Sequence, residues 1–160
     1  MKNRVKFVLP PNLEDFKFSS SKRLILRRLI GNIVKRGKKQ LAEKIFFESL
    51  SILKTRFASV ELDDLFQSVF AKVRPNLGVR PKKMGGIVYK LPVILKDAKQ
   101  NTFMVKWIVQ GAQARSGSLS FSSRLADEIA DIYSGKPTFA VKKRVELERL
   151  ALSNRAFLRG

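Results

Sequence analysis

The sequence of 160 residues contains no cysteine and no histidine. A chain without them has no disulfide framework, no zinc site of the usual cysteine and histidine type, no cysteine nucleophile and no Ser-His-Asp triad. The two absences exclude most familiar catalytic designs. We therefore expect a protein that is not an enzyme and that uses no cofactor, metal ion or small-molecule substrate.

Long apolar runs are also missing. No stretch of more than eight residues lacks a charged side chain, whereas a membrane-spanning helix needs about 18 or more apolar residues. The first residues up to Pro11 have an apolar run of only three residues before two prolines, which is too short for the core of a secretory signal. Glu14 and Asp15 argue against a longer transit peptide. We expect no transmembrane segment and no membrane partner.

Acidic residues are scarce. The chain has 33 Lys and Arg residues against 13 Asp and Glu residues, which leaves a net charge of +20. This excess is larger than solubility requires. Because 44% of the residues are hydrophobic and 12 are Phe, the chain can also bury a core and is not a disordered basic tail. The composition predicts a folded domain that binds a polyanion.

The hydrophobic pattern predicts a mainly α fold, a six-helix bundle-like domain over residues 21–160 with a projecting two-stranded β-hairpin between the third and fourth helices. Residues 1–20 lack periodicity and are predicted to form an extended basic N-terminal arm. The expected helices cover about 21–36, 38–57, 62–73, 98–115, 119–134 and 138–157, and the hairpin covers about 76–95. Gly37 can adopt the left-handed conformation that ends the first helix. Gly85 and Gly86 can form the turn of the hairpin. Pro81 and Pro92 give both strands edge character, so the hairpin should project from the body.

Positive charge is concentrated in two stretches without a single acid. Residues 21–40 contain Lys22, Arg23, Arg27, Arg28, Lys35, Arg36, Lys38 and Lys39, and residues 72–96 contain Lys72, Arg74, Arg80, Lys82, Lys83, Lys90 and Lys96. Any one of these side chains could simply belong to a solvated face. As groups they would repel one another without a polyanion, which points to nucleic acid.

The hairpin adds a geometric argument, because Arg80, Lys82 and Lys83 flank the apolar tip Met84-Gly85-Gly86. Such a finger could lie along a nucleic-acid groove, or it could be a structural hairpin with solvated lysines. Trp107 could stack on bases, but its position beside other apolar residues predicts a place in the core.

Two other functions fit parts of the pattern. Helices with a basic, proline-containing hairpin also describe a DNA-binding architectural protein that bends the minor groove. The acidic clusters at Asp63-Asp64 and Glu146–Glu148 are the only candidates for an RNA-processing enzyme, although helix-terminal acids and surface ion pairs also explain them.

The order of elements and six short motifs resemble the family of protein seven of the small ribosomal subunit. The motifs are Gly37-Lys38-Lys39 with Ala42-Glu43-Lys44-Ile45, Val73-Arg74-Pro75 with Met84-Gly85-Gly86 and Tyr89-Lys90-Leu91-Pro92-Val93, Lys106-Trp107-Ile108 with Ala112 and Arg115, Leu125-Ala126-Asp127-Glu128, Ala140-Val141-Lys142-Lys143-Arg144, and Asn154-Arg155-Ala156-Phe157. The resemblance covers about residues 20–158.

The resemblance implies a primary rRNA-binding protein of the 3′ major domain that nucleates assembly of the subunit head and places its hairpin near the exit-site tRNA. The implied partners are small-subunit rRNA, exit-site tRNA and neighbouring head and platform ribosomal proteins. The expected rRNA-binding residues are Lys22, Arg23, Arg27, Arg28, Lys35, Arg36, Lys38, Lys39, Arg80, Lys82, Lys83, Lys90, Arg115, Lys142, Lys143 and Arg144. The expected tRNA-proximal tip is Lys82, Lys83, Met84, Gly85 and Gly86.

Several positions depart from the family pattern. Glu148 stands where the family usually has His, Val145 stands where it has an acid, and the chain ends at Gly160 without the family's aromatic and basic tail. The segment up to about Phe18 also matches poorly. These departures and the phenylalanine-rich core are typical of an organelle-encoded member, so we expect a ribosome in the mitochondrion, with the bacterial cytoplasm and the plastid as alternatives.

Overall fold

The computed structural model describes residues 13–117 and 119–159. Its helices are α1 (Ser20–Ile33), α2 (Lys39–Arg56), α3 (Leu62–Val73), α4 (Asp97–Ala114), α5 (Phe121–Tyr133) and α6 (Phe139–Ser153), its strands are β1 (Leu77–Met84) and β2 (Ile87–Ile94), and short 3-10 turns cover Leu13–Asp15 and Arg155–Arg159. This part of the chain confirms the predicted fold class, a mainly α protein of six helices with a hairpin between the third and the fourth.

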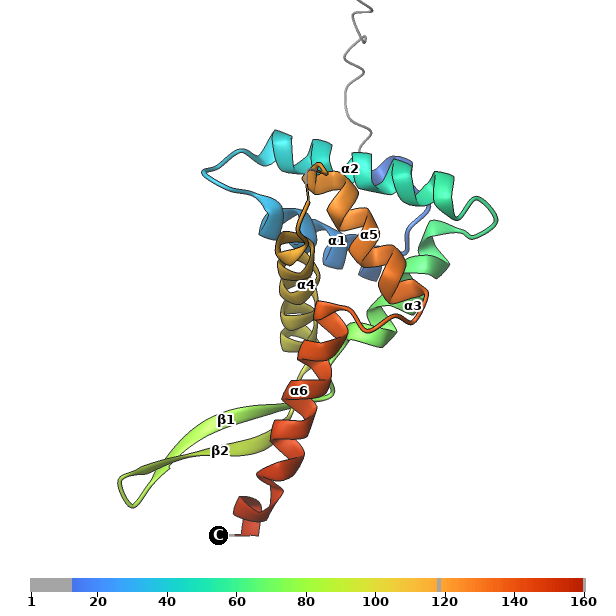
Figure 1. The fold of residues 1–160 in the computed structure, drawn as a ribbon. Coiled ribbons are helices and arrows are strands. Elements are labelled where there is room, and N and C mark those ends of the chain that lie inside the picture. The colour runs from blue at the N-terminus through green and yellow to red at the C-terminus, as the bar shows by residue number, and fades with distance from the viewer. Residues whose placement is uncertain (1–12, 118, 160) are drawn as a thin grey trace, which may run out of the picture.

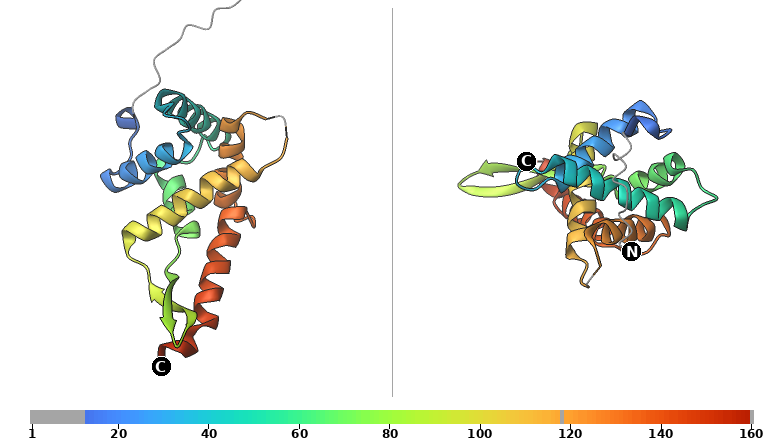
Figure 2. Two further views of the ribbon diagram at one scale, coloured as in Figure 1. Left: turned by 90° about the vertical axis from the view of Figure 1, so that its left-hand side faces the viewer. Right: turned by 90° about the horizontal axis from the view of Figure 1, so that it is seen from above.

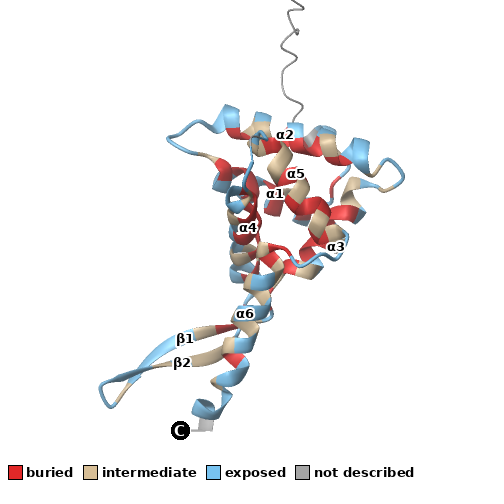
Figure 3. Cartoon of the chain, in the orientation of Figure 1, coloured by how far each residue is buried: buried red, intermediate tan, exposed pale blue. Residues whose placement is uncertain are grey.

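The helices α1 to α5 enclose one hydrophobic core, which appears as the buried inner faces in Figure 3. The clearest amphipathic pattern predicted its buried face correctly, because Leu65, Phe66, Val69, Phe70 and Val73 of α3 are all buried. Burying one such side chain stabilises the fold by about 1.5–3 kcal/mol. The core therefore holds α1 to α5 as a rigid support for the segments that project from it.

Trp107 belongs to this core, as the sequence predicts. Only 7% of its surface is exposed. Its ring stacks on that of Phe103, one turn earlier in α4, with the centroids 5.3 Å apart. Trp107 is therefore not available for stacking on a base.

Two helices end earlier than the periodicity suggests. The first expected helix reaches residue 36, but α1 ends at Ile33 and its C-terminal cap is Val34. The last expected helix reaches residue 157, but α6 ends at Ser153. Its start is as predicted, because the Thr138 hydroxyl accepts a hydrogen bond from the Val141 amide at 3.4 Å.

The described part of the expected N-terminal arm, residues 13–19, packs against the helical body and begins with a short 3-10 turn at Leu13–Asp15. Leu13 and Phe18 are buried in the core, only 7% and 5% exposed. The ring of Phe16 stacks on that of Phe47 in α2 at 5.8 Å. Burial of these apolar side chains against the helices stabilises the packed conformation of this segment. The rest of the predicted arm, residues 1–12, lies outside the described residues.

The hairpin and α6 extend from one end of the helical body (Figure 1). The second orientation shows that α6 runs beside the hairpin (Figure 2). Antiparallel pairing continues from Leu77 opposite Ile94 to Met84 opposite Ile87. Among the described helices, none combines the length and the apolar content needed to cross a lipid bilayer.

Candidate nucleic-acid interface

A tight turn connects α1 to α2 and presents four cationic side chains. Arg36 and Gly37 both have positive φ, 53° and 71°, and the Lys38 amide donates a hydrogen bond to the Lys35 carbonyl at 3.1 Å. Positive φ at both central residues is the signature of a type I′ turn, in which an arginine is unusual. Lys35, Arg36, Lys38 and Lys39 are all exposed. The turn thus points its cations into solvent.

The β-hairpin presents the second group of cations. Gly85 and Gly86 have φ values of 59° and 83°, so the predicted two-residue turn is confirmed. Arg80, Lys82 and Lys83 on β1 and Lys90 on β2 are exposed. Because side chains alternate along a strand, Arg80 and Lys82 share one face of the hairpin and Lys83 lies on the other. The finger is therefore cationic on both faces near its tip.

The hairpin is closed at its base by a backbone hydrogen bond and is attached to α6 and to the C-terminal 3-10 turn. The Asn76 amide donates to Oε1 of Glu148 in α6 at 3.1 Å, and the Asn76 carbonyl accepts from the Leu95 amide at 3.0 Å. Nearer the tip, the rings of Tyr89 and Phe157 lie 4.9 Å apart. Glu148, one of the departures from the family pattern, thus has a structural role.

The α1–α2 turn and the hairpin project toward the same side of the molecule, the left-hand side of Figure 1 and of the view from above in Figure 2. The N-terminus of α4, which follows the hairpin, lies between them. Nη1 of Arg28 in α1 contacts the carbonyl of Ala98 in α4 at 3.5 Å. A single elongated polyanion could therefore contact the turn, α1 and the hairpin together.

Two of the predicted rRNA-binding residues are engaged inside the protein. Lys22 is buried, and its Nζ lies 2.5 Å from Oδ2 of Asp63 in α3. The Ser19 amide donates to the other oxygen of Asp63 at 3.2 Å. The hydrogen bond from Lys22 lowers the pKa of Asp63, and partial burial opposes this. The geometry gives Lys22 a role in attaching α1 to α3.

Arg115 is the second such residue, because it bridges two acids of α5. Its Nε lies 2.9 Å from Oε2 of Glu128 and its Nη2 lies 2.7 Å from Oδ2 of Asp131. Burial works against the charge of Arg115, but the hydrogen bonds to the two carboxylates raise its pKa. Burial likewise works to raise the pKa of Asp131, but the hydrogen bonds from Arg115 and Lys136 lower it. Arg115 therefore stabilises the α4–α5 corner.

The predicted cations of α6 are divided. Lys142 is exposed. Nζ of Lys143 lies 3.1 Å from Oε2 of Glu146, one turn along the helix. Arg144 is half-buried. Of the three, Lys142 is best placed to meet a phosphate.

Most residues of the two acidic clusters form contacts within the protein. Asp63 pairs with Lys22, Glu146 with Lys143, and Glu148 accepts from the Asn76 amide. Among the described residues, no three acids lie close enough to hold a metal ion together. Asp63, Glu146 and Glu148 therefore each have a partner within the protein.

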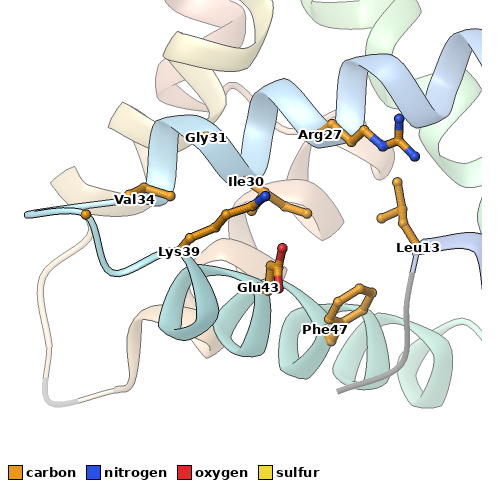
Figure 4. A pocket seen from close by; sticks show the side chains of 9 residues that line it. Leu13, Arg27, Ile30, Gly31, Val34, Lys39, Glu43 and Phe47 are labelled. Atoms are coloured by element: carbon orange, nitrogen blue, oxygen red, sulfur yellow. The ribbon is translucent and has the colours of Figure 1, made fainter. Parts of the chain in front are cut away.

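A groove of about 860 Å³ separates α1 from α2 (Figure 4). Arg27 and Lys39 line it, but Glu43 extends into it from α2. The carboxylate makes this groove less suited to a phosphate than the exposed turn. A second pocket lies beside the turn itself and includes Arg124, Phe121 and Gln113 from α4 and α5. Sequence reasoning missed these residues because they join the turn only through the tertiary fold.

Comparison with known proteins gives a consistent result. A family model described as Ribosomal protein S7p/S5e matches residues 3–155. Small ribosomal subunit protein uS7 of Desulfotalea psychrophila is 32% identical over 147 residues, 92% of this chain and 90% of that protein. Proteins of the same name from Chloroflexus aurantiacus and Wigglesworthia glossinidia brevipalpis are 31% and 37% identical over 149 and 145 residues, 93% and 91% of this chain and 89% of each of those proteins. The family match begins well before residue 20, so the likeness extends further toward the N-terminus than expected.

Proposed function

Because the chain belongs to the ribosomal protein S7p/S5e family of small-subunit constituents, we propose that it docks on the 3′ major domain of the small-subunit rRNA and nucleates assembly of the subunit head. The family is structural and rRNA binding is inherent to it, so the chain is a ribosomal protein that binds rRNA. The comparisons give no support to a DNA-binding architectural protein.

The cations of the α1–α2 turn and the hairpin carry the proposal. Within residues 13–117 and 119–159, none of the exposed cations Lys35, Arg36, Lys38, Lys39, Arg80, Lys82, Lys83 and Lys90 forms an ion pair with an acid. When these side chains contact rRNA phosphates, they displace the counterions condensed on the RNA, and the release of those counterions would supply most of the affinity. Arg23, Arg27, Arg28 and Lys142 to Arg144 extend the proposed surface, and Lys22 and Arg115 are left out because of their internal partners.

Specificity must have another source, because an A-form RNA helix hides its base edges in a deep, narrow groove. The rigid helical body holds the turn and the hairpin at a fixed separation. We expect the protein to recognise the shape of a junction between RNA helices, through 2′-hydroxyl groups and splayed bases.

The test is salt-dependent binding of the purified chain to the 3′ major domain, with a structured control RNA and duplex DNA of equal length as competitors. A preference for the 3′ major domain that persists at about 150–200 mM salt supports the proposal. Equal binding to all three nucleic acids, lost together as the salt concentration rises, would contradict it.

The hairpin tip, Lys82 to Gly86, is proposed to approach the exit-site tRNA. Its support is the projection of the hairpin away from the helical body (Figure 1). Changing Lys82 and Lys83 to Ala should leave rRNA docking nearly intact and change tRNA protection at the exit site. Footprints in which rRNA protection is lost and tRNA protection is normal would reverse this assignment.

Neighbouring head and platform proteins are proposed to contact the apolar side chains exposed on the hairpin and at the C-terminus. Ile94, Val88 and Leu158 are 84%, 61% and 58% exposed, which is a large apolar surface for this end of the molecule. Cross-linking in assembled subunits should find partner proteins here. Cross-links confined to α1 and α2 would place the protein contacts elsewhere.

The chain is a component of the ribosome, and we propose the mitochondrion as its compartment. The basis is the departure from the family pattern at Val145 and Glu148. Mass spectrometry of ribosomes purified separately from mitochondria and from the other compartments tests the assignment. Recovery only in ribosomes from another compartment would overturn it.

A further inference from the structure

A small pocket beside the α1–α2 turn combines an apolar interior with a cationic rim. It has a volume of about 330 Å³ and is lined by Ile33, Lys35, Arg36, Lys38, Leu41, Ala42, Ile45, Gln113, Phe121 and Arg124. This volume lies at the lower end of the range for sites that hold small molecules, about 300–1,000 Å³. It therefore admits one aromatic ring system and its immediate substituents.

The interior of the pocket is apolar because three helices each contribute an apolar side chain. Ile33 is buried at the end of α1, Ile45 of α2 is half-buried, and Phe121 begins α5. Leu41 of α2 remains 50% exposed, which is unusual for a leucine beside a core. A flat apolar ligand would cover this surface.

The rim of the pocket has groups that fit a nucleotide. Lys35, Arg36 and Lys38 are exposed and, within the described part of the chain, pair with no acid. The guanidinium of Arg124 lies 5.5 Å above the ring of Phe121, and its Nη1 donates to the Arg115 carbonyl at 3.1 Å. Arg124 is thus held in place as a cationic surface on which a base can stack.

Gln113 supplies polar recognition at the same pocket. Its side chain is exposed on α4 and carries both a donor and an acceptor. A primary amide can hydrogen-bond to the edge of a base, whereas a lipid tail or an aliphatic side chain would leave it unpaired. The pocket also contains no acid, unlike the groove between α1 and α2, where Glu43 lies.

We propose that this pocket binds one unstacked nucleotide of the small-subunit rRNA. The base enters between Leu41 and the Arg124–Phe121 pair, its edge meets Gln113, and its flanking phosphates lie on the turn. The inference rests on the proposed function and adds to it a site where one base of single-stranded RNA stacks and meets a side-chain amide.

The experiment compares Leu41→Ala and Gln113→Ala with wild type in complexes with full-length small-subunit rRNA. Leu152→Ala is the matched control, because Leu152 is equally exposed, at 53%, and lies on α6 outside the pocket. Chemical probing measures which bases the protein protects and so reports whether a base occupies the pocket. Ultraviolet cross-linking with mass spectrometry identifies the nucleotide. Circular dichroism verifies that each variant is folded.

The expected result is one unpaired base that wild type and Leu152→Ala protect and that both pocket variants leave reactive. The cross-linked peptide should contain Leu41 or Phe121. Affinity should fall by about tenfold in the pocket variants, and the salt dependence should stay unchanged because no cation is removed.

Two other outcomes distinguish failure of the pocket inference from failure of the proposed function. If wild type binds rRNA with a steep salt dependence but both pocket variants match Leu152→Ala, the pocket is empty in the complex and the inference fails while the proposed function stands. If wild type does not prefer the rRNA over the control RNA, the proposed function itself fails, and the pocket inference fails with it.

Discussion

Gly111 of α4 offers a quantitative test of the packing between α4 and α5, because two opposing effects meet at this residue. Changing Gly to Ala inside a helix normally stabilises the helix by about 1 kcal/mol. At Gly111, however, a Cβ atom would overlap Oε1 of Glu128 and would lie 2.7 Å from its Cδ. Glu128 is only 2% exposed and is held by Arg115 at 2.9 Å.

The magnitude follows from what Glu128 would lose. Overpacking a core costs about 1–3 kcal/mol, and a hydrogen bond to a charged group contributes about 1.5–3 kcal/mol. Arg115 keeps its second partner, Asp131 at 2.7 Å, which limits the loss. With the gain in helix propensity subtracted, Gly111→Ala should destabilise the protein by about 2 kcal/mol. For a chain of this size, that lowers Tm by about 4–8 °C.

Gly31 of α1 supplies the control, because an added Cβ there has no neighbour within 4 Å. Gly31→Ala should raise stability by about 0.5 kcal/mol, less than the full helix-interior value because Gly31 lies in the last turn of α1. Both variants are measured by thermal and urea unfolding. A second test is Glu128→Ala in the Gly111→Ala background, where removal of the overlap should give a coupling energy of at least about 1 kcal/mol. A Gly111→Ala protein as stable as wild type would refute the argument.

Three further predictions concern charge and the hairpin. Asp63→Asn should cost about 2 kcal/mol at neutral pH, because it leaves the buried ammonium of Lys22 without its counterion while Asp63 itself is 29% exposed. The pKa of Asp63 is lowered in the folded protein, so its stabilisation is fully present above the unfolded pKa and is lost as the pH falls through the folded pKa. In urea titrations, the stability difference between wild type and variant should therefore begin to shrink below about pH 4. Arg36→Asn should preserve the left-handed turn, keep or slightly raise stability, and reduce the salt slope of rRNA binding by about 0.7–0.9; an unchanged slope would remove Arg36 from the phosphate contacts. Phe157→Ala should speed amide exchange in β2 around Tyr89 and leave the exchange of α3 unaltered; equal exchange in both proteins would show that the C-terminal ring does not hold the hairpin.

The elements that local sequence patterns predict well are those whose energetics are local. The apolar repeat of α3 determines its buried face, and the Gly85-Gly86 pair supplies the positive φ that a two-residue hairpin loop requires. The end of α1 was predicted less well. The helix ends before Val34, and Arg36 and Gly37 form the turn that follows. Nothing in the sequence indicates that an arginine would adopt a positive φ.

The N-terminal segment shows a second kind of failure. Leu13, Phe16 and Phe18 have no helical or strand periodicity, so the sequence offers no reason to place them in the core. They pack against surfaces that form only when the helices assemble, as the stacking of Phe16 on Phe47 shows. Tertiary burial of this sort can be found only once the body is built.

The cations of the candidate interface divide by whether an acid reaches them. Lys22 lies in an acid-free stretch of sequence, yet its partner Asp63 is 41 residues away and packs against it. Arg115 finds Glu128 and Asp131 across the α4–α5 corner. Local charge counting cannot anticipate such pairs, because the fold decides which acids come near.

The same reasoning explains why charge counting succeeds for the turn and the hairpin. Each is a tight turn with two consecutive residues of positive φ, Arg36 and Gly37 in one and Gly85 and Gly86 in the other. A segment that turns back on itself in this way projects from the body, and the acids of α3 and α5 that pair with Lys22 and Arg115 stay behind on the helices. Cations near such a turn keep their charge uncompensated until a polyanion arrives. Sequence charge therefore identifies an interface most reliably where the backbone carries the charge away from the rest of the chain.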